Sequence, residues 1–89
     1  METRMIIVIG HVQGVGFRFS TKMIADELGI TGYAENVQDY VEILATGSAE
    51  ALDTFTRRVV EGASPSSSVH DYSVKQLDLD DSYKKFSTK

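Results

Sequence analysis

The chain has 89 residues, with 42% apolar and 25% charged side chains, a formal net charge of −4 and no cysteine. This length allows one domain, residues 1–89, and the lack of cysteine excludes disulfides and thiolate chemistry. The acidic balance excludes the basic surface that most nucleic-acid-binding domains carry.

The N-terminal part of the chain predicts a strand followed by a helix. The apolar run Arg4–Ile9 ends at Gly10 and predicts a buried strand, and it is far too short to cross a membrane. The segment Phe17–Leu28 predicts a helix, because Met23, Ile24 and Leu28 fall on one helical face. We therefore expect a strand-to-helix connection between residues 10 and 17.

The middle of the chain predicts a β-hairpin and a second helix. Thr31–Val37 and Val41–Thr46 have strand composition and are joined by the short segment Gln38–Tyr40. Ser48 is a favourable N-cap, and Gly62 is a typical residue beyond a helix C-terminus. The side chains that this second helix is expected to bury are Ala51, Leu52, Phe55 and Val59.

The last third predicts a connection, a strand and a short edge strand. Gly62–Ser68 is rich in glycine, proline and serine, Val69–Leu79 alternates, and an edge strand is expected around Phe86. Asp78–Asp81 is expected to be a solvated acidic loop, because it lacks the glycine and glutamate of an EF-hand. The order βαββαβ with a short C-terminal strand predicts an α+β fold, a ferredoxin-like α/β sandwich with an antiparallel sheet and both helices on one face.

This topology places the first connection beside the end of the second strand. The first two strands run parallel with the third between them, so Gly10–Arg18 is expected near Ala34–Asn36. The stretch GHVQGVGFR supplies Gly10, Gly14 and Gly16, which free the backbone to form an anion nest before a helix N-terminus. Arg18 adds a cation suited to phosphate. By itself the pattern also fits a tight turn with a solvated arginine.

Known phosphate-binding motifs do not account for this loop. The Walker pattern and the Rossmann G-x-G-x-x-G pattern are both absent, and no cysteine is available as a nucleophile. His11 and His70 are too few for a zinc site. The aromatic neighbours of Arg18 are Phe17 and Phe19, and one of them is expected to pack in the core beneath the loop.

GHVQGVGFR resembles the first signature of the acylphosphatases, small enzymes that hydrolyse carboxyl–phosphate anhydrides. The segment LGITGYAENVQDYVEILATG, residues 28–47, is similar to the family's second signature. The resemblance implies a phosphate-binding loop and a water-positioning asparagine. The phosphate-binding residues that it implies are Gln13, Gly14, Val15, Gly16, Phe17 and Arg18. The catalytic residues that it implies are Arg18 and Asn36.

The implied reaction is direct attack of a water on phosphorus, with no cofactor and no metal ion. Its substrate would be a small acyl phosphate, with inorganic phosphate as product and inhibitor. The sequence further predicts a cytoplasmic monomer without nucleic-acid or membrane partners. The alternative is a non-catalytic phosphate- or anion-binding module on the same fold.

Two positions depart from the family pattern. Tyr40 stands where glycine commonly follows the hairpin Asp39, so we expect a change of turn type close to Asn36. A tyrosine held at positive φ would otherwise cost roughly 1–2 kcal/mol. Tyr33 replaces a frequent tryptophan and is expected to pack in the core or at an edge.

Overall fold

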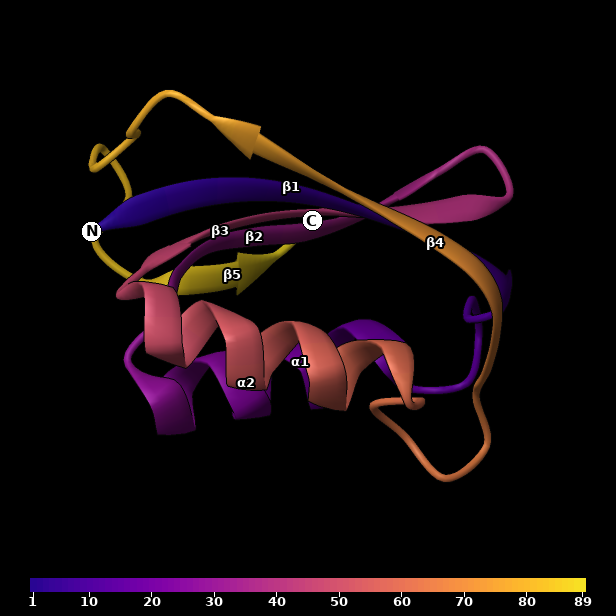
Figure 1. Cartoon of the computed structure of the whole chain (residues 1–89). Helices are drawn as coiled ribbons and strands as arrows, with labels where there is room; N and C mark the ends of the chain where they lie inside the picture. Colours follow the sequence, from indigo (N-terminus) through magenta and orange to yellow (C-terminus); the bar gives the residue numbers. More distant parts are fainter.

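The computed structural model describes residues 1–89 as a five-stranded sheet with two helices on one face (Figure 1). The elements are β1 (Glu2–His11), α1 (Phe17–Leu28), β2 (Thr31–Val37), β3 (Tyr40–Gly47), α2 (Ala49–Val60), β4 (Ser68–Leu77) and β5 (Phe86–Thr88). This order and the two-layer architecture confirm the predicted fold. Neither helix is long and apolar enough to span a membrane.

The strand order in the sheet is β4-β1-β3-β2-β5. Antiparallel pairing joins β1 to β3, β1 to β4 and β2 to β3, as expected for the first four strands. The tail strand β5 instead pairs parallel with β2, which makes the sheet mixed. Because β3 is antiparallel to both β1 and β2, these two strands end at the same edge of the sheet. The loop before α1 therefore lies near the end of β2.

The hydrophobic core fills the space between the sheet and the helices. Phe17 and Ile24 enter it from α1, and Phe55 from α2 contacts Phe86 of β5 with ring centroids 6.0 Å apart. The prediction that Met23 faces the core is wrong, because its side chain is 57% exposed. Ile24 of the same predicted face is buried, together with Ala25 beside it, so the buried stripe of α1 is narrower than the apolar pattern indicates.

The β2–β3 hairpin has two loop residues rather than three. Val37 pairs with Tyr40, so Tyr40 is the first residue of β3 and only Gln38 and Asp39 form the turn. The positive φ of this turn, 54°, falls on Gln38. The altered turn is thus accommodated without a left-handed tyrosine, at a cost of about 1 kcal/mol on Gln38.

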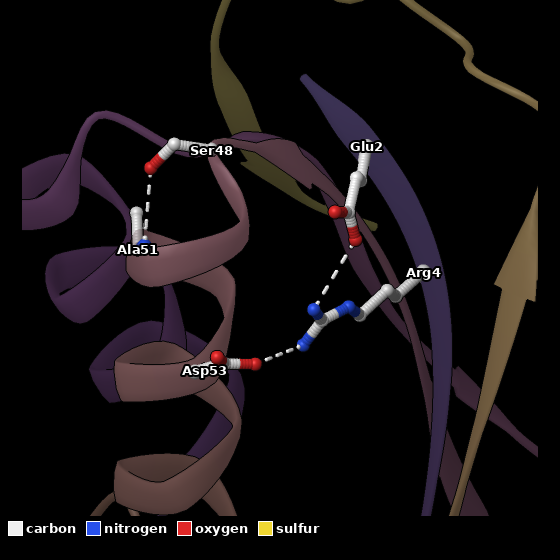
Figure 2. Close-up of polar contacts among 5 residues, drawn as sticks. All are labelled: Glu2, Arg4, Ser48, Ala51 and Asp53. Atoms are coloured by element: carbon white, nitrogen blue, oxygen red, sulfur yellow. Dashed lines mark hydrogen bonds and ion pairs between the residues drawn. The ribbon is translucent and has the colours of Figure 1, made fainter.

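An arginine on the helix-facing side of β1 joins the sheet to α2 (Figure 2). Arg4 donates through Nη1 to Asp53 at 2.8 Å and through Nη2 to Glu2 at 3.2 Å. The hydrogen bond to Asp53 raises the pKa of Arg4. Ser48 accepts a hydrogen bond from the Ala51 N–H at 3.1 Å, which confirms the predicted N-cap of α2.

Two buried threonines hold the segment that leads from β4 to β5. Thr3 and Thr46 share a hydrogen bond of 2.7 Å between their hydroxyls. The Asp80 N–H donates to Thr3 at 2.8 Å, and its carbonyl accepts from Thr46 at 2.8 Å. The predicted acidic loop is therefore attached to the sheet through its backbone, while Ser82 donates to the Asp80 carboxylate and lowers its pKa. Further along the chain, β5 is held beside β2 by parallel pairing, with hydrogen bonds from the Gly32 N–H to Lys85 and from the Lys89 N–H to Ala34.

We expect Thr46→Val to destabilise the protein by about 1–3 kcal/mol, because it leaves the Asp80 carbonyl with only a long contact to Thr3. Urea denaturation followed by circular dichroism measures the change. Thr56→Val is the matched control, since the hydroxyl of Thr56 is buried without a hydrogen-bond partner. Equal midpoints for wild type and Thr46→Val would contradict the stabilising role of this network.

Candidate active site

The loop between β1 and α1 carries two glycines in the left-handed region. Gly14 has φ 74° and Gly16 has φ 77°, and a Cβ at either position would meet nothing within 4 Å. Backbone conformation, rather than crowding, therefore requires glycine there. Gly16 is also the N-cap of α1, which has no side-chain cap and no acidic residue in its first turn. The N–H groups of that turn are left as donors for an anion.

Gly10 has a different role from the one expected. It belongs to β1, at a register shift against β4, and a Cβ there would lie 2.3 Å from the carbonyl oxygen of Ser68. Its φ is 148°. Gly10 thus permits the close approach of two strands and is not part of the anion nest.

Two side chains from distant segments brace the loop. The Gln13 amide donates through Nε2 to the carbonyls of Gln38 and Tyr40, at 2.9 and 3.0 Å. The hydroxyl of buried Ser64 donates to the Val15 carbonyl at 3.0 Å. The Val15 carbonyl and the Gly16 N–H belong to the same trans peptide and point in opposite directions. The hydrogen bond from Ser64 to that carbonyl therefore points the Gly16 N–H away from Ser64. The loop is therefore held on one side by the hairpin and on the other by the α2–β4 connection.

These contacts change the roles of two residues. The side chain of Gln13 is committed to the β2–β3 turn, so the contact with phosphate predicted for Gln13 is left to its backbone N–H. Ser64 was not identified from the sequence. Its partner lies 49 positions away, and Gly62–Ser68 shows only the composition of a turn.

A hollow of about 170 Å³ lies in front of the loop. Gly14, Gly16 and Arg18 form its polar side. The other residues that line it are Val12, Phe17, Phe19 and Thr88. The sequence did not single out Thr88, which reaches the hollow only because β5 lies beside β2.

Arg18 is half-buried at the start of α1. Its Nη1 donates to the backbone carbonyl of Lys89, just beyond β5. The Lys89 N–H donates in turn to the Ala34 carbonyl of β2 at 2.8 Å. A chain of hydrogen bonds thus connects the guanidinium to β2.

Asn36 lies two residues beyond Ala34, on the strand opposite Val41. Side chains alternate along a strand, so Asn36 shares the helix-facing side with buried Ala34. Asn36 is exposed, makes no side-chain hydrogen bond within the chain, and does not line the hollow. Its amide is therefore free for a water or a ligand at this edge of the sheet.

Tyr33 lies on the opposite face of the sheet from the helices. Its hydroxyl donates to Glu42 at 2.7 Å, its ring centroid is 5.8 Å from that of Tyr83, and the Lys89 ammonium lies 3.9 Å from its ring centroid. Burial, followed by the hydrogen bond to Glu42, raises the pKa of Tyr33 well above its ordinary value. These contacts agree with the packing role expected for Tyr33.

No group of three or more histidine, aspartate, glutamate or cysteine side chains is placed to hold a metal ion. His11 is exposed, and the ring of His70 makes a hydrogen bond of 3.4 Å with the Ser68 hydroxyl. The charged and polar groups around the hollow are thus Arg18, Thr88 and backbone N–H groups.

Comparisons with known proteins agree with this loop-and-sheet geometry. Residues 4–88 match the model of the acylphosphatase family. An acylphosphatase of Staphylococcus haemolyticus is 41% identical over 97% of both chains, and one of Staphylococcus aureus is 47% identical over 81% of both chains. The crystal structure of acylphosphatase from Bacillus subtilis superposes with a TM-score of 0.94 at 42% identity, covering 100% of this chain and 99% of that one. The chain belongs to the acylphosphatase family.

Loss of the Ser64 hydroxyl is expected to loosen the loop without unfolding the protein. We predict that Ser64→Ala lowers kcat/KM for acetyl phosphate about fivefold, the equivalent of one hydrogen bond of about 1 kcal/mol. Phosphate affinity should weaken in parallel if the loop N–H groups bind both ligands, as the sequence predicts. Steady-state kinetics and isothermal titration calorimetry with inorganic phosphate measure the two effects.

Ser66→Ala is the control for this variant, because Ser66 is exposed in the same connection and makes no side-chain hydrogen bond. It should behave as wild type in both assays. Wild-type kinetics and phosphate affinity in Ser64→Ala would show that the Val15 carbonyl needs no partner.

Proposed function

We propose that Arg18, the loop N–H groups and Asn36 together carry out the hydrolysis of acyl phosphates to a carboxylate and inorganic phosphate. Membership of the acylphosphatase family makes the chain an enzyme of this type. The single observation that supports the residue assignment is the hollow lined by Gly14, Gly16 and Arg18 at an uncapped helix N-terminus.

The phosphoryl group binds in this hollow. The guanidinium of Arg18 carries forked donors that match phosphate oxygens, and the N–H groups of the loop and of the first turn of α1 add further donors. These donors come from Gln13 to Arg18, with the Gln13 side chain bracing the loop rather than contacting the ligand. Inorganic phosphate, the product, occupies the same donors and inhibits.

The chemical step is a single displacement at phosphorus. A water oxygen forms a bond to phosphorus while the bond from phosphorus to the carboxylate oxygen breaks, and the electron pair leaves with the carboxylate. Both protons of the water remain on the phosphate product. The leaving group is a weak base and needs no proton. Catalysis can therefore rest on positioning and on stabilisation of charge at the phosphoryl oxygens, the task of Arg18 and the N–H groups.

Asn36 orients the attacking water. Its amide offers both an acceptor and two donors, so it can accept a hydrogen bond from the water and hold its lone pair toward phosphorus. The freedom of the Asn36 side chain and its place on the helix-facing side of β2 support this assignment. One chain supplies every group named here, so the proposed site needs no second subunit; the monomeric state and the cytoplasmic location stay predictions from the sequence.

Arg18→Ala should lose at least about 10²-fold in kcat/KM, the scale of one donor to a developing oxyanion. Acetyl phosphate hydrolysis, assayed without added metal, measures this loss. The matched control is Lys22→Ala, which removes a neighbouring cation that is paired with Asp26 at 2.6 Å. Calorimetry should show that phosphate binding is lost in Arg18→Ala and kept in Lys22→Ala.

Retained turnover in Arg18→Ala would contradict the assignment of the hollow at Gly14, Gly16 and Arg18 as the phosphate-binding site. Phosphate binding by wild type without any turnover would instead support the non-catalytic anion-binding module.

Asn36→Ala should lower kcat by at least about tenfold, corresponding to one hydrogen bond of about 1.4 kcal/mol made in the transition state. Phosphate affinity should stay close to that of wild type, because water positioning is a rate effect. The control is Gln76→Ala, which removes an exposed amide from β4. An equal loss of phosphate affinity and kcat in Asn36→Ala would place this residue in phosphate binding instead.

A further inference from the structure

An exposed aromatic side chain borders the phosphate hollow. Phe19 follows Arg18 in the first turn of α1, is 64% exposed and lines the hollow together with Arg18 and the loop glycines. Phe17, the other aromatic neighbour of Arg18, is 1% exposed and belongs to the core. Phe17 therefore accounts for the packing beneath the loop, and packing does not explain Phe19.

The size of the hollow places the acyl part of a substrate at its rim. Its volume of about 170 Å³ is below the roughly 300–1,000 Å³ of pockets that enclose a drug-sized ligand. With the phosphoryl group held by Arg18 and the loop N–H groups, the acyl group must extend outward. Phe19 is the one large exposed apolar side chain that lines the hollow.

The chemistry of the lining favours an uncharged acyl group. Arg18 is the only charged side chain that lines the hollow, and it is used by the phosphoryl group. The walls away from the glycines are Val12, Phe17, Phe19 and the Thr88 hydroxyl. An acyl group with its own phosphate or carboxylate would find no second cation there.

Apolar surface continues along α1 beyond Phe19. Met23 lies four residues later, on the same helical face, and is exposed. Met23 also lines a second hollow of about 250 Å³ together with Ile24 and Ala63, and the polar side of this hollow is Ser20 and the ion pair of Glu27 with Arg58. An aromatic or extended apolar acyl group can therefore remain in contact with carbon atoms for more than one helical turn.

We propose that Phe19 forms an acyl subsite that selects acyl phosphates with an aromatic or extended apolar acyl group over small or negatively charged ones. This inference rests on the proposed function, because it assumes that the phosphoryl group is bound by Arg18 and the loop N–H groups. Phe19 is a specificity-determining residue whose ring contacts the acyl group by offset stacking or edge-to-face packing.

The test compares benzoyl phosphate with acetyl phosphate for wild type and Phe19→Ala. The ratio of their kcat/KM values should fall about 3- to 10-fold in Phe19→Ala, as expected when one aromatic contact is lost. Comparing the ratio within each protein cancels the different intrinsic reactivities of the two anhydrides. Inhibition by benzoylphosphonate, a non-hydrolysable analogue, should weaken by a similar factor relative to acetylphosphonate.

The matched control is Tyr72→Ala, which removes an aromatic side chain that is 50% exposed on β4 and does not line the hollow. Its ratio should equal that of wild type, and inorganic phosphate should inhibit all three proteins alike. An unchanged substrate ratio and unchanged phosphonate selectivity in Phe19→Ala would overturn the acyl subsite.

Arg18→Ala separates this outcome from failure of the proposed function. If Arg18→Ala loses hydrolysis of both substrates while the Phe19→Ala ratio is unchanged, the subsite alone is wrong. If Arg18→Ala hydrolyses both substrates as well as wild type does, the proposed phosphate site is wrong. The acyl subsite of Phe19 is then wrong as well, because it assumes that site.

Discussion

The hydrogen bond from Ser64 to the Val15 carbonyl connects the stability of the fold to the geometry of the site. A glycine-rich loop has many conformations in the unfolded chain and is costly to order. Ser64 holds this loop by the Val15 carbonyl, and the Gln13 side chain anchors it to carbonyls of the β2–β3 hairpin. Neither contact occupies the backbone N–H groups that an anion needs. The site is thus organised before any ligand arrives, the condition for electrostatic stabilisation of a transition state.

A protein with net charge −4 must attract its anionic substrate by local positive potential. The structure concentrates that potential at one point, where the uncapped N-terminus of α1 meets the guanidinium of Arg18. The hydrogen bond from Arg18 to the backbone oxygen of Lys89 holds the side chain near β5. The parallel pairing of β5 with β2 therefore contributes to the site, since it brings Lys89 within reach of Arg18.

Much of this arrangement could be predicted from local patterns. The helix α1, the hairpin and the N-cap of α2 follow from apolar periodicity, turn residues and Ser48, and each depends on residues within a few positions of one another. The hairpin was predicted less accurately at its turn, where three connecting residues were expected and two are found. Tyr40 pairs with Val37, and the residue with positive φ is Gln38. Met23 shows the limit of periodicity, which identifies apolar positions but not which of them another element covers.

The sequence by itself determined the element order, the glycine pattern of the loop and the family resemblance, because short-range spacing encodes them. Only the tertiary structure decided which residues shape the site. It assigned Gly10 to strand packing, Gln13 and Ser64 to bracing, and Thr88 and Phe19 to the walls of the hollow. Most of these roles arise from contacts between segments that lie dozens of residues apart in the sequence. A local pattern of side chains does not predict which distant segment a residue will contact.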